Sequence, residues 1–443
     1  MTINAYREAL RYIYSYARYN PSDVTRWSLD RLKELLDRLD NPHKRFPSLL
    51  IAGTKGKGST SALCENILRQ AGYKTGLYTS PHLHSFRERI RVEGALIEEA
   101  ALIALTNKLR PFFEATPGLT AFELITTLAF VAFAEANIDT AVLEVGLGGR
   151  LDATNAVDPA VAVITSISYD HTQILGNTLT LIAREKGGII RPGALVISAP
   201  QVDEAMRAIE EVCSERQARL VVVGRDWKWQ PGPFNLEGQH FTIGNEEYFL
   251  PFLGDHQMVN AVTAVAAITG FSVQTGLQVP AEAIKNGLAT ADWPGRMEIL
   301  KRQPYLVVDS AMNGDSAEKL VKTLHQYFSE AKITFIFGAS SDHPVPDMLK
   351  AILPAAKRVF MTASTHPRAA KPESLAAMAA ELGYQVIVEP DLPTTLEQAL
   401  VGAGPDDLIC ATGSLFLVAE IRESWLRRNH MPLPPVDPAN LFD

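Results

Sequence analysis

Residues 48–60 read SLLIAGTKGKGST, and this stretch decides the fold prediction for the chain. The apolar run 49–52 predicts a buried strand, the glycines after it predict a tight turn, and a helical pattern extends from about Ser59 to Gln70. A second apolar run at about 75–79 predicts another strand. A strand, a loop, a helix and a strand in this order form a crossover between parallel strands.

The same alternation continues along the first two thirds of the chain. The runs TAVLEV (140–145), VAVITSI (161–167) and ALVISA (194–199) predict strands, and FELITTLAFVAFAEA (122–136) predicts a helix. This pattern favours a mostly parallel sheet with helices on both faces. The other elements expected here are an amphipathic helix at 28–40, short antiparallel strands between about 220 and 255, and helices at 256–268 and 281–289.

A Pro-Gly break in DWPGRME (292–298) predicts a hinge between two domains. Beyond it the alternation restarts, with five short β-type runs interleaved with helices, and the Pro-rich tail 431–443 is expected to be loosely held. A chain of 443 residues is too long for one hydrophobic core. We therefore predict an α/β protein with domains at 1–296 and 297–443.

Charge and cysteine content exclude several classes of protein. The 42 Lys and Arg against 50 Asp and Glu give a net charge of −8, so no long-range positive field attracts a nucleic acid or an anionic membrane. Cys64, Cys213 and Cys410 are far apart, which argues against a disulfide framework and a structural zinc site. The amino-terminal stretch lacks the apolar block of a signal peptide, and no run of about 18 apolar residues follows. We expect a cytoplasmic protein with neither nucleic-acid nor membrane partners.

The turn 53–59 predicts phosphate binding, because glycines let the main chain approach an anion at the start of a helix. Lys57 supplies a point charge, and Ser59 or Thr60 supplies a hydroxyl for Mg²⁺. Only two residues separate Gly53 from Gly56, where the common loop has four. A bland glycine turn with a solvated lysine is the alternative.

Glu144 ends a predicted strand, at the edge where doubly wound sheets bind their ligands, and its carboxylate would complete a Mg²⁺ shell. The loop after it carries Asp152, for which a self-capped polar loop is the alternative. Taken alone, His171 is typical of a surface or a satisfied core histidine, and Lys186 of a solvated helix lysine.

Together these stretches resemble the folylpolyglutamate synthase/dihydrofolate synthase family, the folate branch of the muramyl-ligase-like ATP-dependent amide ligases. The resemblance extends from about residue 20 to about residue 425. It is carried by the leucine-rich helix ending in Asn41-Pro42, GTKGKGS (53–59), TSPHL (79–83), RERIRVEG (87–94), EVGLGGRLDATN (144–155), DHT (170–172), EKGGII (185–190), GDHQ (254–257) with Asn260, WPGR (293–296) and ATGSLFL (411–417).

The resemblance implies a central ATP-binding domain with a P-loop-type sheet, a smaller Rossmann-like carboxy-terminal domain, and an active site between them. It implies ATP and Mg²⁺ as cofactors, with two metal sites, and a carbamylated Lys186 that supports the second. The catalytic residues it implies are Lys57, Lys186, His171 and Arg296. The implied nucleotide contacts are Gly53, Thr54, Lys55, Gly56, Lys57, Gly58, Ser59, Asn260, Arg296 and Asp309; the metal ligands are Ser59, Ser80, Glu144 and His171; and the substrate residues are His82, Arg89, Phe122 and Asp152.

The activity implied is ATP-dependent joining of L-glutamate to folate or dihydropteroate through an acyl phosphate, by a monomer that serves folate biosynthesis and one-carbon metabolism. Two segments depart from the family pattern. Met312 stands where the family has a histidine, and Asp342-His343-Pro344 stands where it has Asp-Lys-Asp. A paralogous amide ligase with another acceptor and a non-catalytic ATP-binding homologue are therefore the alternatives.

Overall fold

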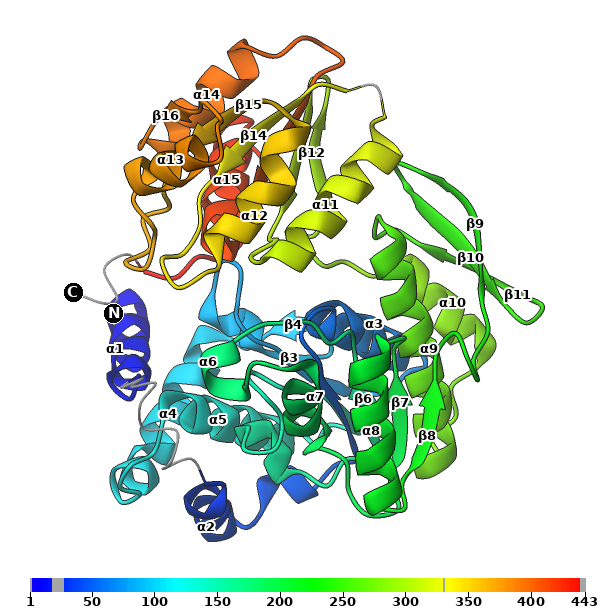
Figure 1. Cartoon of the computed structure of the whole chain (residues 1–443). Helices are drawn as coiled ribbons and strands as arrows, with labels where there is room; N and C mark the ends of the chain where they lie inside the picture. The colour runs from blue at the N-terminus through cyan, green and yellow to red at the C-terminus, as the bar shows by residue number, and fades with distance from the viewer. Residues whose placement is uncertain (1, 18–27, 330, 439–443) are drawn as a thin grey trace.

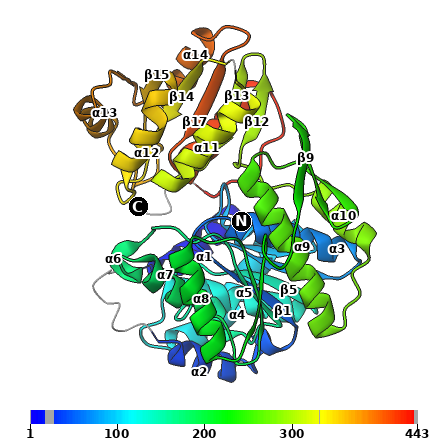
Figure 2. The same ribbon diagram turned by 45° about the vertical axis from the view of Figure 1, so that its right-hand side comes forward.

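The computed structural model describes residues 2–17, 28–329 and 331–438, which form two lobes (Figure 1). The larger lobe is built on an eight-stranded sheet and the smaller lobe on a six-stranded sheet. A three-stranded antiparallel sheet stands beside the larger lobe, next to helices α9 and α10 (Figure 2). The α/β fold class predicted from the sequence is confirmed.

The large sheet is parallel over its centre, and only the two strands at one edge, β4 and β3, run antiparallel to their neighbours. The predicted strands at 49–52, 75–79, 140–145, 161–167 and 194–199 all lie in it. In sheet order its strands are β4 (Ala95–Leu96), β3 (Ile90–Val92), β2 (Thr75–Tyr78), β5 (Thr140–Glu144), β1 (Ser48–Ala52), β6 (Val161–Ile164), β7 (Leu195–Ser198) and β8 (Arg219–Val222).

Helices cover both faces of this sheet, because every second side chain of a strand points to the same face. In β1, Leu49 and Ile51 pack into one core and Leu50 and Ala52 into the other. The first core is closed by α3 (Lys57–Gln70), α9 (Asp255–Thr275) and α10 (Ala281–Ala289), and the second by α1 (Thr2–Ser15), α2 (Asp30–Arg38), α4 (Glu99–Glu114), α5 (Ala121–Ala136), α7 (Leu179–Gly187) and α8 (Asp203–Glu215). The short helices of this lobe are η2 (Pro42–Lys44), η3 (Phe86–Arg89), η4 (Ala153–Ala156) and α6 (Thr172–Leu175).

Helix α9 is a core helix. Within the part of the chain that the structure describes, it is the one helix long and apolar enough to cross a membrane, and most of it is buried inside the protein. Cys64, Cys213 and Cys410 are all buried and free.

The smaller lobe repeats the layered arrangement. Its strands, in sheet order, are β12 (Glu298–Arg302), β13 (Tyr305–Asp309), β17 (Leu408–Thr412), β14 (Ile333–Phe337), β15 (Ala356–Met361) and β16 (Ile387–Val388). Its helices are α11 (Gly314–Tyr327), α12 (Val345–Ile352), η5 (Leu353–Ala355), α13 (Pro372–Glu381), α14 (Leu392–Val401) and α15 (Leu415–Arg428).

Three secondary-structure predictions need correction. Strand β12 is a sixth strand where five are expected, because a charged segment, EILKR, pairs antiparallel at a sheet edge and carries no apolar run. The 220–255 region is antiparallel only in β9 (Gln230–Asn235), β10 (Gly238–Ile243) and β11 (Glu246–Leu250), since β8 joins the large sheet parallel to β7. Helix α1 is not predicted at all.

The tail is also held more firmly than expected, because the Asp437 carboxylate accepts hydrogen bonds from Tyr6, Ser85 and Phe86. The last five residues of the predicted loose segment, 439–443, lie outside the described residues.

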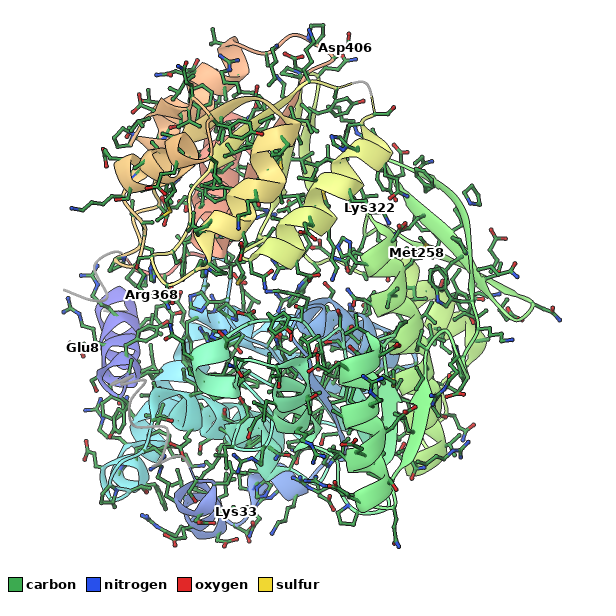
Figure 3. All side chains as sticks on the ribbon, in the orientation of Figure 1. Glu8, Lys33, Met258, Lys322, Arg368 and Asp406 are labelled. Atoms are coloured by element: carbon green, nitrogen blue, oxygen red, sulfur yellow. The ribbon has the colours of Figure 1, made fainter. Side chains whose placement is uncertain are left out.

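The two lobes also meet beside α9. Lys322 on α11 reaches toward the amino end of α9, on the side where Met258 lies (Figure 3), and its Nζ is 2.7 Å from Oδ2 of Asp255. Tyr327, the last residue of α11, donates a hydrogen bond from its hydroxyl to Oε1 of Gln239 on β10 at 3.2 Å. Helix α11 therefore rests on the larger lobe and on the three-stranded sheet.

The contact between α10 and α3 requires glycine at position 287, because a Cβ atom there would lie 2.5 Å from the Cα of Ile67. We predict that Gly287→Ala lowers the free energy of unfolding by about 1–3 kcal/mol, as overpacking does. This loss outweighs the helix propensity that alanine adds, about 1 kcal/mol. Urea unfolding measures the difference.

Gly404→Ala is the matched control, since nothing lies within 4 Å of the Cβ that it adds. Its effect should stay within about 0.5 kcal/mol. Equal stability of the two variants would mean that α10 and α3 do not pack this closely.

Candidate active site

The predicted phosphate loop lies between the end of β1 and the start of α3, and two of its glycines cannot be replaced without a clash. Gly53 has φ +152°, and a Cβ atom there would lie 1.8 Å from Oγ1 of Thr165. Gly56 has φ +88°, and a Cβ atom there would lie 2.2 Å from Oδ1 of Asn260. Both backbone conformations disfavour residues with side chains. The loop therefore runs close beside β6 and α9 and opens at the amino end of α3.

A charged and a hydroxyl side chain of the predicted phosphate loop lie in the first turn of α3. Lys57 is the first residue of α3, and its Nζ donates to the carbonyl oxygens of Gly53 at 3.1 Å and Thr54 at 3.3 Å. Ser59 is buried in the first turn of the same helix. The N–H groups of a first turn have no partner inside the helix, so they are available to an anion.

Glu144 is the last residue of β5, and its side chain is buried beside the loop. Its Oε2 accepts a hydrogen bond from the backbone N–H of Ser80, which follows β2, at 3.0 Å. Burial raises the pKa of the Glu144 carboxyl, while the charges of Lys57 and Arg296 act in the opposite direction. The structure thus brings Ser80, Glu144, Lys57 and Arg296 to one place.

Lys186 lies at the end of α7 and is 4% exposed, so it is not the solvated helix lysine that its neighbours in sequence suggest. Its Nζ donates to the carbonyl oxygen of Gly53 at 3.0 Å. Burial, with a further contribution from the nearby charge of Lys57, lowers the pKa of Lys186 from 10.5 to about 7. Near pH 7 the neutral amine is therefore far more accessible to Lys186 than to an exposed lysine.

His171 precedes α6 with a left-handed backbone, φ 49°, and its side chain is 56% exposed. Its Nε2 lies 3.8 Å from Oδ1 of Asp170, whose other oxygen accepts a hydrogen bond from Nζ of Lys55 at 3.0 Å. Asp170 belongs to the DHT run (170–172) that carries the resemblance, and its carboxylate links Lys55 of the turn 53–59 to the segment that holds His171.

The residues predicted to hold metal offer oxygen donors for the most part. Among the described residues, no three His, Cys, Asp or Glu side chains gather into a metal cluster. Ser59, Ser80 and Glu144 carry the hydroxyl and carboxylate oxygens that Mg²⁺ prefers, and a cation would offset the burial of the Glu144 carboxylate. These three residues fit a magnesium ion, whereas the ring of His171 is directed to Asp170.

The predicted substrate residues come from three elements. Nδ1 of His82 accepts a hydrogen bond from Nε of Arg89 at 2.9 Å. The ring of Phe122, on α5, lies 6.1 Å from the ring of Tyr78 and directly under Gly146, where a Cβ atom would be 2.4 Å from its Cζ. His82 and Arg89 are thus partners, and Phe122 supports the loop that follows β5.

Asp152 is buried in that same loop and organises it. Its carboxylate accepts hydrogen bonds from the N–H of Leu147 at 2.9 Å, the N–H of Thr154 at 3.0 Å and the hydroxyl of Thr154 at 2.6 Å. These contacts agree with the alternative to a substrate role for Asp152, namely that its carboxylate caps its own polar loop.

Arg296 and Asp309 bring the start of the smaller lobe to the site. Asp309 ends β13, and its carboxylate accepts hydrogen bonds from the N–H groups of Met297 and Ala311, both at 2.9 Å. Burial lowers the pKa of the Arg296 guanidinium, and the charges of Asp309 and Glu144 act against that change. Arg296 therefore lies between a carboxylate of each lobe.

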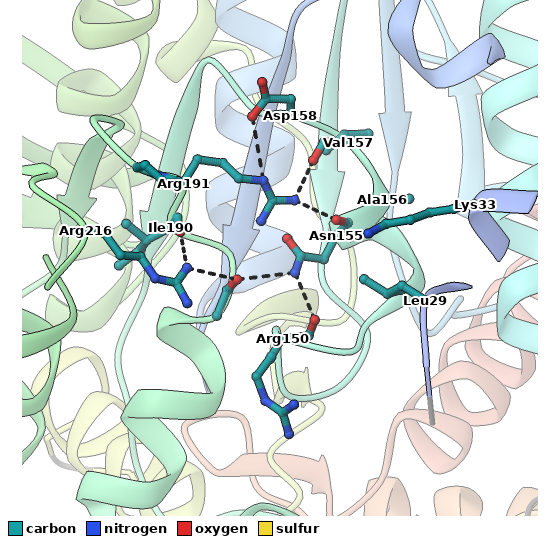
Figure 4. Close-up of a pocket in the computed structure, with 12 residues that line it drawn as sticks. Leu29, Lys33, Arg150, Asn155, Ala156, Val157, Asp158, Ile190, Arg191 and Arg216 are labelled. Carbon is teal, nitrogen blue, oxygen red and sulfur yellow. Dashed lines mark hydrogen bonds and ion pairs between the residues drawn. The ribbon is translucent and has the colours of Figure 1, made fainter. Parts of the chain in front are cut away.

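A pocket of about 500 Å³, lined by residues that include Lys33, Asn155, Arg191 and Arg216, lies elsewhere (Figure 4). It lies at the amino ends of β6, β7 and β8, whereas the phosphate loop lies at the carboxyl end of β1. Arg191 donates to the carbonyl oxygens of Asn155 and Val157, both at 2.7 Å. These contacts join loops at that edge, and none of the predicted site residues lines the pocket.

Two family models match the chain, one to each lobe. Residues 51–268 match the Mur ligase middle domain, and residues 295–415 match the Mur ligase glutamate ligase domain. The dihydrofolate synthase/folylpolyglutamate synthase of Bacillus subtilis is 34% identical over 434 residues, which cover 95% of this chain and 99% of that protein. The chain belongs to the folylpolyglutamate synthase/dihydrofolate synthase family.

Solved structures of the family superpose along nearly the whole chain. The protein FolC of Escherichia coli in complex with DHPP and ADP has a TM-score of 0.84 at 31% identity, covering 95% of this chain and 97% of that one. A bifunctional folylpolyglutamate synthase/dihydrofolate synthase with Mn, AMPPNP and L-glutamate bound has a TM-score of 0.79 at 32% identity, covering 91% and 95%.

The two segments that depart from the family pattern both lie in the smaller lobe. Met312 precedes Asn313, which caps α11 by accepting a hydrogen bond from the N–H of Ser316 at 3.0 Å. His343 lies within electrostatic reach of Lys55 and Asp170 of the larger lobe, and both charges act on its pKa, which burial lowers. The His343 segment therefore faces the phosphate loop across the two lobes.

The buried Lys186 has a consequence for stability that can be measured. The unfolded chain keeps this lysine protonated up to about pH 10.5, whereas the folded chain releases the proton near pH 7. Between these values the unfolded state binds more protons, so unfolding becomes less favourable as the pH rises. We predict that the stability of the native protein relative to Lys186→Met increases by up to about 1.4 kcal/mol per pH unit between pH 7 and 10. Urea unfolding at pH 7, 8 and 9 measures it.

Lys108→Met provides the control, because the Lys108 side chain is 62% exposed. The difference between native protein and this control should not change with pH. The lowered pKa of Lys186 would be contradicted if the difference in unfolding free energy between the native protein and Lys186→Met also stayed constant with pH.

Proposed function

We propose that this chain is an ATP-dependent ligase that joins L-glutamate to the carboxylate of a folate or of dihydropteroate. The observation that carries the proposal is the assembly of a glycine loop, Lys57, Glu144 and Arg296 at one place between the lobes. Its relatives are named as enzymes of this activity, and their solved complexes contain ADP, DHPP, AMPPNP, Mn and L-glutamate.

The reaction that this geometry suits has two steps. The substrate carboxylate attacks the γ-phosphate of ATP, so that ADP leaves and an acyl phosphate forms. The glutamate amine then attacks the acyl carbon, loses a proton, and phosphate leaves as the amide bond forms. Negative charge develops on oxygen in both steps, and preorganised cations stabilise it. We assign this role to Lys57 and Arg296, whose charges both act on the buried Glu144 carboxyl.

Each predicted residue is given a proposed role. We assign the turn 53–59, with Asn260, Arg296 and Asp309, to the nucleotide. Ser59, Ser80 and Glu144 would hold Mg²⁺, with His171 joining them once its ring turns from Asp170; the ion neutralises phosphate charge when bound. His82, Arg89, Phe122 and Asp152 are assigned to the folate end, Asp152 through the loop that it organises.

Lys186 would serve in a carbamylated form. The ammonium group first loses a proton; the neutral amine then attacks CO₂ and loses a second proton, so that the cationic side chain becomes an anionic carbamate. Its lowered pKa supplies the neutral amine near pH 7, and its hydrogen bond to Gly53 places it under the phosphate loop. The anion would support a second magnesium ion.

Further features follow from the same proposal. We propose domains at 1–296 and 297–443 that meet at the WPGR segment, and a cytoplasmic monomer that acts on small molecules.

A phosphate-release assay with Mg-ATP and L-glutamate, run separately with dihydropteroate and with tetrahydrofolate, tests the activity. Release that depends on neither pterin substrate would favour a ligase with another acceptor. Binding of Mg-ATP without turnover would favour a non-catalytic homologue.

We predict that Lys57→Ala and Glu144→Ala each lower kcat by about a hundredfold or more. Loss of one group that stabilises developing charge costs roughly 3 kcal/mol of barrier, and the buried site offers no substitute. The phosphate-release assay measures kcat. Lys108→Ala and Glu135→Ala are matched controls from a surface ion pair and should keep native rates. Near-native rates in both site variants would remove the proposed site.

We predict that Met312→His raises activity, because a thioether lacks the N–H donor and the positive charge that an imidazole offers to a nucleotide. Met312 is half-buried and directly precedes Asn313, the residue that caps α11. The measurement is kcat/KM for ATP in the same assay. An unchanged value would show that other residues of this chain perform the role of the missing histidine.

A further inference from the structure

The segment that follows α15 crosses from the smaller lobe to the loop 82–89 of the larger lobe. The backbone N–H of Asp437 donates to the carbonyl oxygen of His84 at 3.3 Å. Its carboxylate accepts hydrogen bonds from the hydroxyl of Ser85 at 3.0 Å and the N–H of Phe86 at 2.9 Å. One residue of the tail is thus bound to three consecutive residues of this loop.

Asp437 also joins the loop to α1. The hydroxyl of Tyr6 donates to Oδ1 of Asp437 at 2.9 Å, and Nε2 of His82 lies 3.7 Å from Oδ2. The Asp437 side chain is only 11% exposed. Burial raises the pKa of this carboxyl, and the hydrogen bonds from Phe86, Tyr6 and Ser85 act against the change. Burying a carboxylate without hydrogen-bond donors costs free energy. The donors around Asp437 offset that cost, so the tail has a specific binding site on the larger lobe.

The ring of His82 is hydrogen-bonded on one side and lies close to Asp437 on the other. Nδ1 accepts a hydrogen bond from Nε of Arg89, so the ring proton is on Nε2, the nitrogen that faces Asp437. The loop is also rigid internally, since the Glu88 carboxylate accepts hydrogen bonds from the N–H groups of Leu83, His84 and Ser85 at 2.8–2.9 Å. Movement of Asp437 would therefore be passed to His82 and Arg89 together.

A second contact links the same loop to the hinge. Nη1 of Arg422, on α15, lies 3.2 Å from Nε2 of His84. Nε of Arg422 donates to both carboxylate oxygens of Glu298, at 2.8 and 3.0 Å, and Glu298 accepts a hydrogen bond from the N–H of Gly295 at 2.8 Å. Gly295 precedes Arg296, so loop 82–89 is connected to the hinge arginine as well as to the tail.

We propose that Asp437 is a positioning residue for the folate or dihydropteroate end of the active site: the carboxyl-terminal segment fastens loop 82–89 and so holds His82 and Arg89 in place for this substrate. The inference rests on the proposed function and adds the residue that ties substrate binding in the larger lobe to the smaller lobe. Asp437 acts through the loop and does not itself touch the reacting atoms.

The test compares the full-length enzyme with Asp437→Ala in steady-state kinetics. We expect the KM for dihydropteroate or tetrahydrofolate to rise about tenfold or more, since the variant loses hydrogen bonds to a charged group. The KM for ATP should stay within about twofold, because the phosphate loop has no contact with Asp437. Equal changes in both KM values, or a fall in kcat alone, would overturn the proposal.

Hydrogen exchange gives a readout that does not depend on turnover. The Phe86 amide, which donates to Asp437, should exchange at least about tenfold faster in Asp437→Ala, while amides of β1 and β5 keep their native rates. Val436→Ala is the matched control from the same segment, where the side chain is 43% exposed, and it should behave as native in both measurements. Native exchange at Phe86 in Asp437→Ala would overturn the proposed link.

Asp437→Asn carries the same test if the alanine variant does not fold, because it keeps the shape and one acceptor oxygen but loses the charge. Its KM for the pterin substrate should rise less than that of the alanine variant and more than that of Val436→Ala. A native KM in both Asp437 variants would overturn the inference while leaving the ligase activity intact. An absence of turnover in the native enzyme would instead refute the proposed function.

Discussion

The burial of one carboxylate, that of Glu144, is the constraint on which the site depends. A buried charge is costly unless opposite charges and hydrogen-bond donors surround it. Here the donor is the N–H of Ser80, and the opposing charges belong to Lys57 of the phosphate loop and Arg296 of the hinge. The compensation for one buried group therefore comes from the larger lobe and from the hinge, and Arg296 at the hinge is in turn within reach of the Asp309 charge of the smaller lobe.

The conformation of the phosphate loop depends on two glycines that have no side chain. Gly53 and Gly56 are pressed against Thr165 and Asn260, so the turn has no space for a Cβ atom. Lys186 lies below it and donates to the carbonyl of Gly53 in surroundings that favour the neutral amine. A ligase that activates a carboxylate must exclude water from its acyl phosphate, and closely packed surroundings of this kind serve that end.

Much of the fold could be predicted because strands and helices here have strong local patterns. The apolar runs that form β1, β5 and β6 are buried on both faces, which makes them continuous in sequence. Strand β12 has no such run, and it exists because the edge of the second sheet offers unpaired backbone groups. A site residue can be predicted from the sequence when it ends a strand, as Glu144 does. A site residue cannot be predicted in this way when its contacts join distant segments, as those of Asp437 and Ser85 do.

The sequence by itself determined the α/β class, the two-lobe order, the glycine turn 53–59 between a strand and a helix, and the family, since these follow from short-range patterns and collinear motifs. Only the tertiary structure decided that Lys186 is buried, that His171 faces Asp170, and that the tail is bound to loop 82–89. The physical reason is that burial and pKa depend on what surrounds a side chain in space. Much of those surroundings comes from segments far apart in the chain, as with Gly53 beside Lys186 and Ser85 beside Asp437, which no local pattern encodes.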